Sequence, residues 1–252
     1  QNKMTVEKIF CNDVTADVAQ VETTEDFKKL VYDCMLCNDT RVLENNELVG
    51  DPTETALVDM ALKQDYTQAV YRENPRVEEV PFDSDRKLMT TVNENNGKYT
   101  VYTKGGVDEL VNKSIGYIIN GEIKYNLDEF RKEINKNNTE MAKNALRVLA
   151  MAYKELDHMP TDDEIKNIEC NLTYVGMVGM IDPPREEAKE AVYKCKTAGI
   201  KTVMITGDHK ITATAIAKAL GILENENEAI TGAELEDCLL YTSPSPRDVE
   251  ES

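Results

Sequence analysis

The sequence lacks any long apolar run, and its composition excludes several classes of protein. None of its hydrophobic stretches approaches the roughly 20 residues that a membrane-spanning helix requires. Basic residues are outnumbered, 29 Lys and Arg against 47 Asp and Glu, and the net charge of −18 disfavours binding to nucleic acid or to anionic lipid. With 252 residues, 41% of them hydrophobic, the chain has room for two modest domains with their own cores.

The sequence also lacks the cysteine pattern of a disulfide-bonded extracellular domain. Its six cysteines are scattered through helix-like and strand-like segments, so we expect them to be reduced and mostly buried. Cys34 and Cys37 have the spacing of a metal or redox pair, but no second pair and no histidine cluster accompanies them. The acidic stretches lack the alternating ligands and later glutamate of a calcium-binding loop. The sequence therefore predicts no metal site.

The most informative segment runs from Lys201 to Asp208, where a β-branched apolar run leads through a polar loop into an alanine-rich helix. Thr206, Gly207 and Asp208 form that loop. In α/β folds such a loop binds phosphate, because the following helix offers unpaired N–H groups and the positive end of its dipole. An ordinary strand-to-helix turn, with Asp208 as the N-cap, is the alternative.

A second strand and helix precede this segment. The apolar run 172–181 predicts a buried strand. Asp182 is typical of a helix N-cap, and residues 186–197 predict a helix that ends at Gly199. The order strand, helix, strand, helix predicts parallel strands with a right-handed crossover. Asp182 and the loop at 206–208 would then lie at one edge of the same sheet.

Residues 10–168 predict a separate α+β domain inserted into the parallel-sheet one. Its first helix is expected over 25–37, and a second begins at Pro52 with Asp51 as N-cap and Glu54 as the reciprocal capping-box partner. Strands over 88–93 and 98–103 form a hairpin, because Asn95-Asn96-Gly97 between them is typical of a tight turn.

In order along the chain, these segments resemble the P-type cation-transporting ATPases, most closely the calcium-pump type. Residues 50–57, 82–87, 104–106 and 146–150 are similar to that family's nucleotide-binding domain, and residues 176–185 and 204–209 are similar to its phosphorylation domain. The resemblance implies an α+β nucleotide-binding domain, with an antiparallel sheet and flanking helices. It also implies part of an α/β phosphorylation domain of the haloacid-dehalogenase-like, Rossmann type.

The resemblance also implies domain boundaries. Residues 1–9 would end a first segment of the phosphorylation domain, 10–168 would be the nucleotide-binding domain, and 169–236 would return to the phosphorylation domain. Residues 237–252 are Ser/Pro-rich and unlike the family, so we expect a foreign or disordered tail.

The same resemblance implies a nucleotide site. Phe82 would stack on adenine, Glu54 would bond near the adenine amino group, and Arg147 would reach the phosphates. The remaining contacts would come from Lys87, Lys104, Gly105, Asp182, Thr206, Gly207 and Asp208, the last ones near the γ-phosphate and its magnesium ion. For single residues the alternatives are structural: Phe82 in the core, Lys87 solvated, Glu54 capping a helix and Arg147 packed on one.

Two departures from the family limit what this chain is expected to do. The catalytic aspartate of the D-K-T-G-T segment is absent from the sequence, and residues 1–5 resemble the stretch directly after that segment in the family, so we expect the isolated chain to be inactive. Gly106 and Val107 stand where the family usually has alanine and proline. Asp83-Ser84-Asp85 has the spacing of a phosphatase nucleophile, but Glu78-Glu79 upstream does not fit the buried strand that must precede one.

The expected function is therefore the cytoplasmic, ATP-binding portion of an ATP-driven cation pump, with ATP and Mg²⁺ as ligands. Its partners would be the actuator, the remaining phosphorylation domain and the transmembrane parts of the same pump. We expect no nucleic acid partner and no direct membrane contact. The alternatives are a nucleotide-binding module without catalysis and a haloacid-dehalogenase-type phosphatase.

Overall fold

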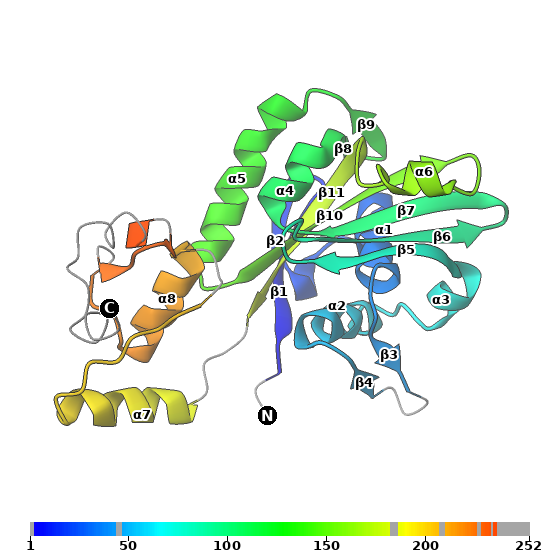
Figure 1. Cartoon of the computed structure of the whole chain (residues 1–252). Helices are drawn as coiled ribbons and strands as arrows, with labels where there is room; N and C mark the ends of the chain where they lie inside the picture. The colour runs from blue at the N-terminus through cyan, green and yellow to red at the C-terminus, as the bar shows by residue number, and fades with distance from the viewer. Residues whose placement is uncertain are drawn as a thin grey trace, which may run out of the picture. The chain divides into compact units, whose positions relative to one another are not determined.

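The computed structural model describes residues 3–43, 47–181, 186–206, 210–225, 228–232 and 234–235 (Figure 1). The chain divides into two compact units, Gln1–Pro183 and Pro184–Ser252. The predicted tail at 237–252 lies outside the described residues. The domain boundaries proposed at 9/10 and 168/169 stay predictions, and β1 (Thr5–Cys11) runs through the first of them.

A mostly antiparallel sheet forms the centre of the first unit. Its strands follow the order β2-β1-β11-β10-β7-β6-β5, and β8 pairs with both β11 and β9. Their bounds are β2 (Val14–Asp17), β5 (Arg76–Asp83), β6 (Leu88–Asn95), β7 (Lys98–Gly105), β8 (Ser114–Ile119), β9 (Glu122–Lys124), β10 (Arg147–Leu156) and β11 (Leu172–Ile181). A separate small ladder joins β3 (Arg41–Val42) to β4 (Leu48–Val49).

Helices cover both faces of this sheet (Figure 1). One face carries α1 (Glu25–Leu36), α2 (Pro52–Lys63) and α3 (Ala69–Glu73), and the other carries α4 (Val107–Lys113) and α5 (Leu127–Lys143). Short helices η1 (Val18–Gln20) and α6 (Asp162–Ile165) complete the unit. An antiparallel sheet with flanking helices confirms the predicted α+β class of the nucleotide-binding domain.

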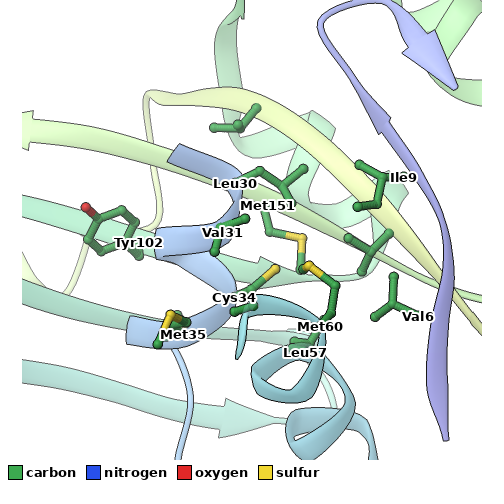
Figure 2. Packing of buried hydrophobic residues seen from close by; sticks show 14 of the residues in the cluster. Val6, Ile9, Leu30, Val31, Cys34, Met35, Leu57, Met60, Tyr102 and Met151 are labelled. Atoms are coloured by element: carbon green, nitrogen blue, oxygen red, sulfur yellow. The ribbon is translucent and has the colours of Figure 1, made fainter. Parts of the chain in front are cut away.

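Strand residues alternate between two cores, as the pleat of a β-strand requires. On β10, Met151 and Tyr153 belong to the core under α1 and α2, whereas Ala150 and Ala152 belong to the core under α4 and α5. Figure 2 shows side chains of α1 and α2 packed against the sheet in the first of these cores. The α1 side chains labelled there, Leu30, Val31, Cys34 and Met35, are all fully buried.

Local sequence signals in this unit are confirmed. Thr24 caps α1 by accepting a 3.1 Å hydrogen bond from the Phe27 amide, one residue before the predicted start. The hairpin of β6 and β7 turns at Asn96 and Gly97, which have φ angles of 51° and 79°. Positive φ at both central residues is what a two-residue type I′ turn requires.

The predicted parallel arrangement around 172–181 is wrong for the described residues. β11 pairs antiparallel with β1 and β10, and parallel only with β8 over Leu172–Tyr174. Because these partners fill both sides of β11, no edge is left for a strand over 201–205. The continuous apolar run of β11 reflects burial on both faces, which does not fix strand direction.

The second unit contains α7 (Glu186–Thr197), which was predicted with these bounds, and α8 (Lys210–Leu220), the alanine-rich helix. Residues 201–206 between them have no regular secondary structure, so the predicted strand over 201–205 is not formed. Val203 and Ile205 are 69% and 93% exposed. Among the described residues of the whole chain, none of the helices has both the length and the apolar content needed to cross a membrane.

Candidate functional site

Glu54 and Lys104 form a sheltered ion pair in the first unit. Glu54 lies in the first turn of α2, and Lys104 lies on β7 opposite Met89 of β6 and Met151 of β10. The Lys104 Nζ atom is 2.5 Å from Glu54 Oε1, and the two side chains are only 7% and 15% exposed. A buried ion pair depends on further hydrogen bonds to both ions, and here each ion has one.

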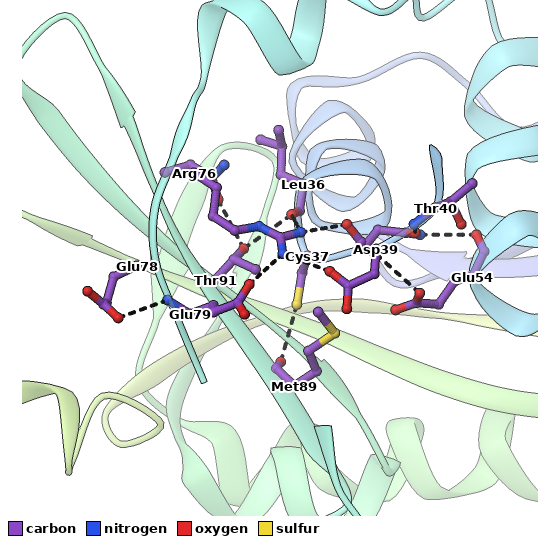
Figure 3. Close-up of polar contacts among 12 residues, drawn as sticks. Leu36, Cys37, Asp39, Thr40, Glu54, Arg76, Glu78, Glu79, Met89 and Thr91 are labelled. Atoms are coloured by element: carbon purple, nitrogen blue, oxygen red, sulfur yellow. Dashed lines mark hydrogen bonds and ion pairs between the residues drawn. The ribbon is translucent and has the colours of Figure 1, made fainter. Parts of the chain in front are cut away.

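The additional hydrogen bonds come from the segment after α1. Lys104 Nζ also donates to the backbone carbonyl of Cys37. Glu54 Oε2 accepts a 3.1 Å hydrogen bond from the Asp39 amide (Figure 3). Both members of the pair are therefore held by main-chain atoms of the segment that follows α1.

The predicted capping box at α2 is wrong in one of its two parts. Asp51 is the N-cap, accepting from the Thr53 amide at 2.8 Å, and Pro52 is the first helical residue, as predicted. Glu54, however, directs its carboxylate to Asp39 and Lys104 rather than back to Asp51. Glu54 therefore makes tertiary contacts with Lys104 and the Asp39 amide instead of the local capping contact.

Phe82, near the end of β5, and Lys87, directly before β6, are exposed, unlike Glu54 and Lys104. Phe82 is 62% exposed. Lys87 Nζ lies 2.6 Å from Glu109 Oε1, and the lysine side chain is 60% exposed. The link between β5 and β6 is a capped turn, since Asp83 Oδ1 accepts from the amides of Asp85 at 3.0 Å and Arg86 at 2.9 Å.

Gly105 joins these two groups of residues. It ends β7, directly after Lys104, and the Gly106 amide donates to the Lys87 carbonyl at 3.1 Å. A Cβ atom at Gly105 would overlap that carbonyl oxygen and the side chain of Leu88. The close approach of the two backbones therefore requires glycine, and it brings Lys87 beside the end of the strand that carries Lys104.

Arg147 lies at the same end of the sheet. It is the exposed first residue of β10, and Ala150 on that strand pairs with Gly105. The structural alternative, an arginine packed on a helix, is wrong because Arg147 lies on a strand and is exposed. Its cross-strand partner on β11 is Met180, one residue before that strand ends.

The remaining predicted phosphate contacts are Asp182, Thr206, Gly207 and Asp208. Asp182, Gly207 and Asp208 lie outside the described residues. Thr206 belongs to the second unit, where it is exposed in the segment without regular structure.

Sequence reasoning missed two charged residues of this region, Asp33 and Arg76. Asp33 on α1 is fully buried, and this burial raises the pKa of its carboxyl well above the usual value, with the charge of Lys104 acting in the opposite direction. Arg76 at the start of β5 reaches the end of α1. The polarity of Asp33 on a largely apolar helix face, which also buries Asp26, was the one local signal; Arg76 gave none.

The predicted burial of the cysteines is confirmed for Cys11, Cys34 and Cys37, which are free thiols, while Cys170 and Cys195 are half-buried. Burial raises the pKa of the Cys37 thiol to about 12. In the part of the chain that the structure describes, no three or more His, Cys, Asp or Glu side chains are placed to hold a metal ion.

Comparison with known proteins identifies the first unit. Residues 26–187 match the family described as "P-type ATPase, cytoplasmic domain N". The chain is 40% identical over 242 residues to Calcium-transporting ATPase 1 of Bacillus cereus, covering 94% of this chain and 27% of that protein. It is 40% identical over 237 residues to Calcium-transporting ATPase 1 of Lactococcus lactis, with the same coverage.

A more distant relative is the sodium/potassium-transporting ATPase subunit alpha of Drosophila melanogaster, 34% identical over 259 residues, with 91% of this chain and 25% of that protein covered. The chain thus spans about a quarter of the length of the curated relatives it matches. It belongs to the P-type ATPase family and contains that family's cytoplasmic domain N.

Proposed function

We propose that this chain is the ATP-binding portion of an ATP-driven cation pump. The observation that carries the proposal is the exposure of Phe82. Of the four phenylalanines, Phe10 and Phe27 are buried and Phe130 is half-buried, whereas Phe82 is 62% exposed. An exposed ring near the end of the strand that leads to Lys87, in a strongly acidic chain, suits stacking on the base of an anionic nucleotide, a contact worth about 1–3 kcal/mol.

The roles of the surrounding residues follow from their chemistry. Glu54 accepts a hydrogen bond from the adenine amino group, using lone pairs that Lys104 and Asp39 leave unused. Gly105 lets the nucleotide approach the backbone. Lys87 and Arg147, both exposed, supply positive charge to the phosphates.

We further propose that residues 169–236 are part of a phosphorylation domain of the haloacid-dehalogenase-like type, within the boundaries predicted from the sequence. Asp182, Thr206, Gly207 and Asp208 then bind the γ-phosphate or its magnesium ion. Magnesium supplies charge neutralisation in phosphoryl transfer, which depends mainly on positioning and electrostatics. The resemblance of 176–185 and 204–209 to the family supports this assignment.

In the complete protein, the phosphoryl group passes from ATP to an aspartate of the phosphorylation domain, and the actuator and transmembrane parts couple this step to ion movement. The chain then lies on the cytoplasmic side of a membrane. Calcium is our proposed ion, because several relatives bear that name. ATP-dependent calcium uptake by vesicles containing the complete protein tests it, and uptake of a different cation would exclude calcium.

Calorimetric titration with ATP and ADP, with and without magnesium, tests nucleotide binding by this chain. We expect weak binding with little dependence on magnesium, because adenine recognition is local to the first unit. Phe82→Ala removes the ring and should weaken binding roughly 5- to 150-fold. Tyr125→Ala is the matched control, since Tyr125 is 71% exposed beyond β9. Equal affinities for both variants and the wild type would contradict the proposal.

Asp83 gives the phosphatase alternative no support, because its carboxylate caps the turn before β6. Those amide hydrogen bonds, Arg86 first, lower the pKa of Asp83. Incubation with labelled ATP and magnesium, followed by acid quench, should leave this chain unlabelled. A hydroxylamine-sensitive label that disappears in Asp83→Asn would instead establish a phosphatase-type nucleophile.

A further inference from the structure

The C-terminal end of α1 depends on cations from outside the helix. The last carbonyls of a helix lack intrahelical partners and carry the negative end of its dipole. The last turn of α1 contains no basic residue. Its charge is matched instead by Arg76 from β5, which donates to the Leu36 carbonyl, and by Lys104 from β7, which donates to the Cys37 carbonyl.

Arg76 makes four contacts, three of which converge on this end of α1 and the segment after it, while the fourth is to Glu79 on its own strand (Figure 3). Its Nη2 atom donates to the carbonyls of Leu36 at 3.2 Å and Asn38 at 2.5 Å. Its Nη1 atom lies 2.7 Å from both Asp39 Oδ1 and Glu79 Oε2. The planar guanidinium suits such a set of acceptors, which a lysine ammonium cannot span in the same way.

The segment that Arg76 holds is the one that contacts Glu54 and Lys104. The Asn38 side chain donates to the Cys34 carbonyl at 2.8 Å and to the Glu54 carbonyl at 3.0 Å. The Asp39 amide donates to the Glu54 carboxylate. Displacement of the segment would therefore move the carboxylate and the ammonium of the ion pair together.

We propose that Arg76 is a positioning residue of the nucleotide site. It fixes residues 36–39 so that their main chain holds Glu54 and Lys104 in the geometry that receives the adenine. This inference rests on the proposed nucleotide-binding function. Arg76 does not itself contact the nucleotide, because both of its terminal nitrogens are engaged by protein acceptors.

Titration of Arg76→Ala with ATP and with adenosine tests the proposal. Loss of positioning acts on the adenine contact, so both ligands should lose affinity by the same factor. We expect affinity to fall about tenfold. In metal sites, mutating residues that only orient the ligands lowers affinity by about 10- to 100-fold, and this value is at the lower end of that range. Arg76→Lys should lose less affinity than Arg76→Ala but more than none, because lysine keeps the positive charge and lacks the planar set of donors of the guanidinium.

Arg131→Ala is the matched control. Arg131 also ties a helix, donating to the Val111 carbonyl of α4 at 3.2 Å and pairing with Asp128, but on the opposite face of the sheet. Its loss should lower the melting temperature without changing affinity. Should Arg76→Ala fail to fold, Arg76→Lys decides in the same way: weaker binding supports the proposal, and unchanged binding overturns it.

The outcomes separate the inference from the proposed function. If the wild type binds no nucleotide, the proposed function fails, and the inference fails with it. If the wild type binds and Arg76→Ala binds as tightly as Arg131→Ala, only the inference fails. A loss of affinity for ATP but not for adenosine would make Arg76 a phosphate contact, which also overturns its positioning role.

Discussion

The candidate site has two halves that differ in burial. The sheltered half, Glu54 and Lys104, is 15% and 7% exposed and is held by the end of α1. The exposed half, Phe82 and Lys87, is about 60% exposed, and the Lys87 side chain pairs with Glu109 in the first turn of α4. Residues of the sheltered half therefore serve folding and binding together, whereas those of the exposed half are free to serve binding alone.

The largest effect is expected from breaking the sheltered pair. Lys104→Met leaves the mostly buried Glu54 carboxylate without its cation, so we expect a loss of about 3 kcal/mol in unfolding free energy, together with loss of nucleotide binding. Urea denaturation and ATP titration measure the two effects. Lys166→Met, in an exposed pair with Asp163, should change stability by less than about 0.5 kcal/mol.

The double variant Glu54→Gln/Lys104→Met sharpens this prediction. It removes both charges, so much of the stability lost in Lys104→Met should return while nucleotide binding stays lost. Stability of Lys104→Met equal to that of the wild type would show that the pair is not sheltered in solution.

Gly105→Ala should break the junction between the two halves. The added methyl would overlap the Lys87 carbonyl and Leu88, and overpacking of this kind costs about 1–3 kcal/mol. Thermal unfolding measures it, with Gly232→Ala as control, since a Cβ there meets no atom within 4 Å. A Gly105→Ala protein as stable as the control would mean that the two backbones lie further apart in solution.

Lys87→Gln should have a smaller effect, and on binding only. Its ion pair with Glu109 is solvent-exposed, so unfolding free energy should change by less than about 0.5 kcal/mol, while ATP affinity falls by no more than about fivefold. The loss of affinity should shrink as salt is added, because exposed charges are screened. A salt-independent loss of affinity would place Lys87 in the sheltered half instead.

The smallest effect is the pH dependence of that same ion pair. Burial raises the pKa of Glu109, but the hydrogen bond and charge of Lys87 outweigh it and lower the pKa below its ordinary value of 4.5. The stabilisation is therefore present above pH 4.5 and lost as pH falls through the depressed value. Denaturation of the wild type and Lys87→Gln between pH 3 and 7 should show curves that converge in acid. A difference that persists at pH 3 would exclude this origin.

Local signals predicted the elements that carry Gly105 and Glu54. Asn96-Gly97 set the hairpin register that places Gly105 opposite Leu88, and Asp51-Pro52 set the start of α2 that places Glu54. Each of these signals is encoded within a few adjacent residues. The fold class of the first unit followed from them and from the family resemblance.

The contacts of the sheltered half could not be predicted, because its partners are distant in sequence. Arg76 reaches carbonyls 38 and 40 residues earlier, and Lys104 reaches a carbonyl 67 residues earlier. Strand pairing is nonlocal in the same sense, so the apolar runs at 172–181 and 201–205 looked alike although only the first finds partners in the described residues.

The central claim is that one adenine nucleotide engages both halves of this site, and amide chemical shifts recorded during an ADP titration test it most directly. We predict concentration-dependent shifts at Asp39 and Glu54 in the sheltered half and at Phe82, Lys87 and Gly105 in the exposed half, with none at Gly121 beyond β8. Shifts confined to residues outside this group, or no shifts at millimolar ADP, would contradict the account.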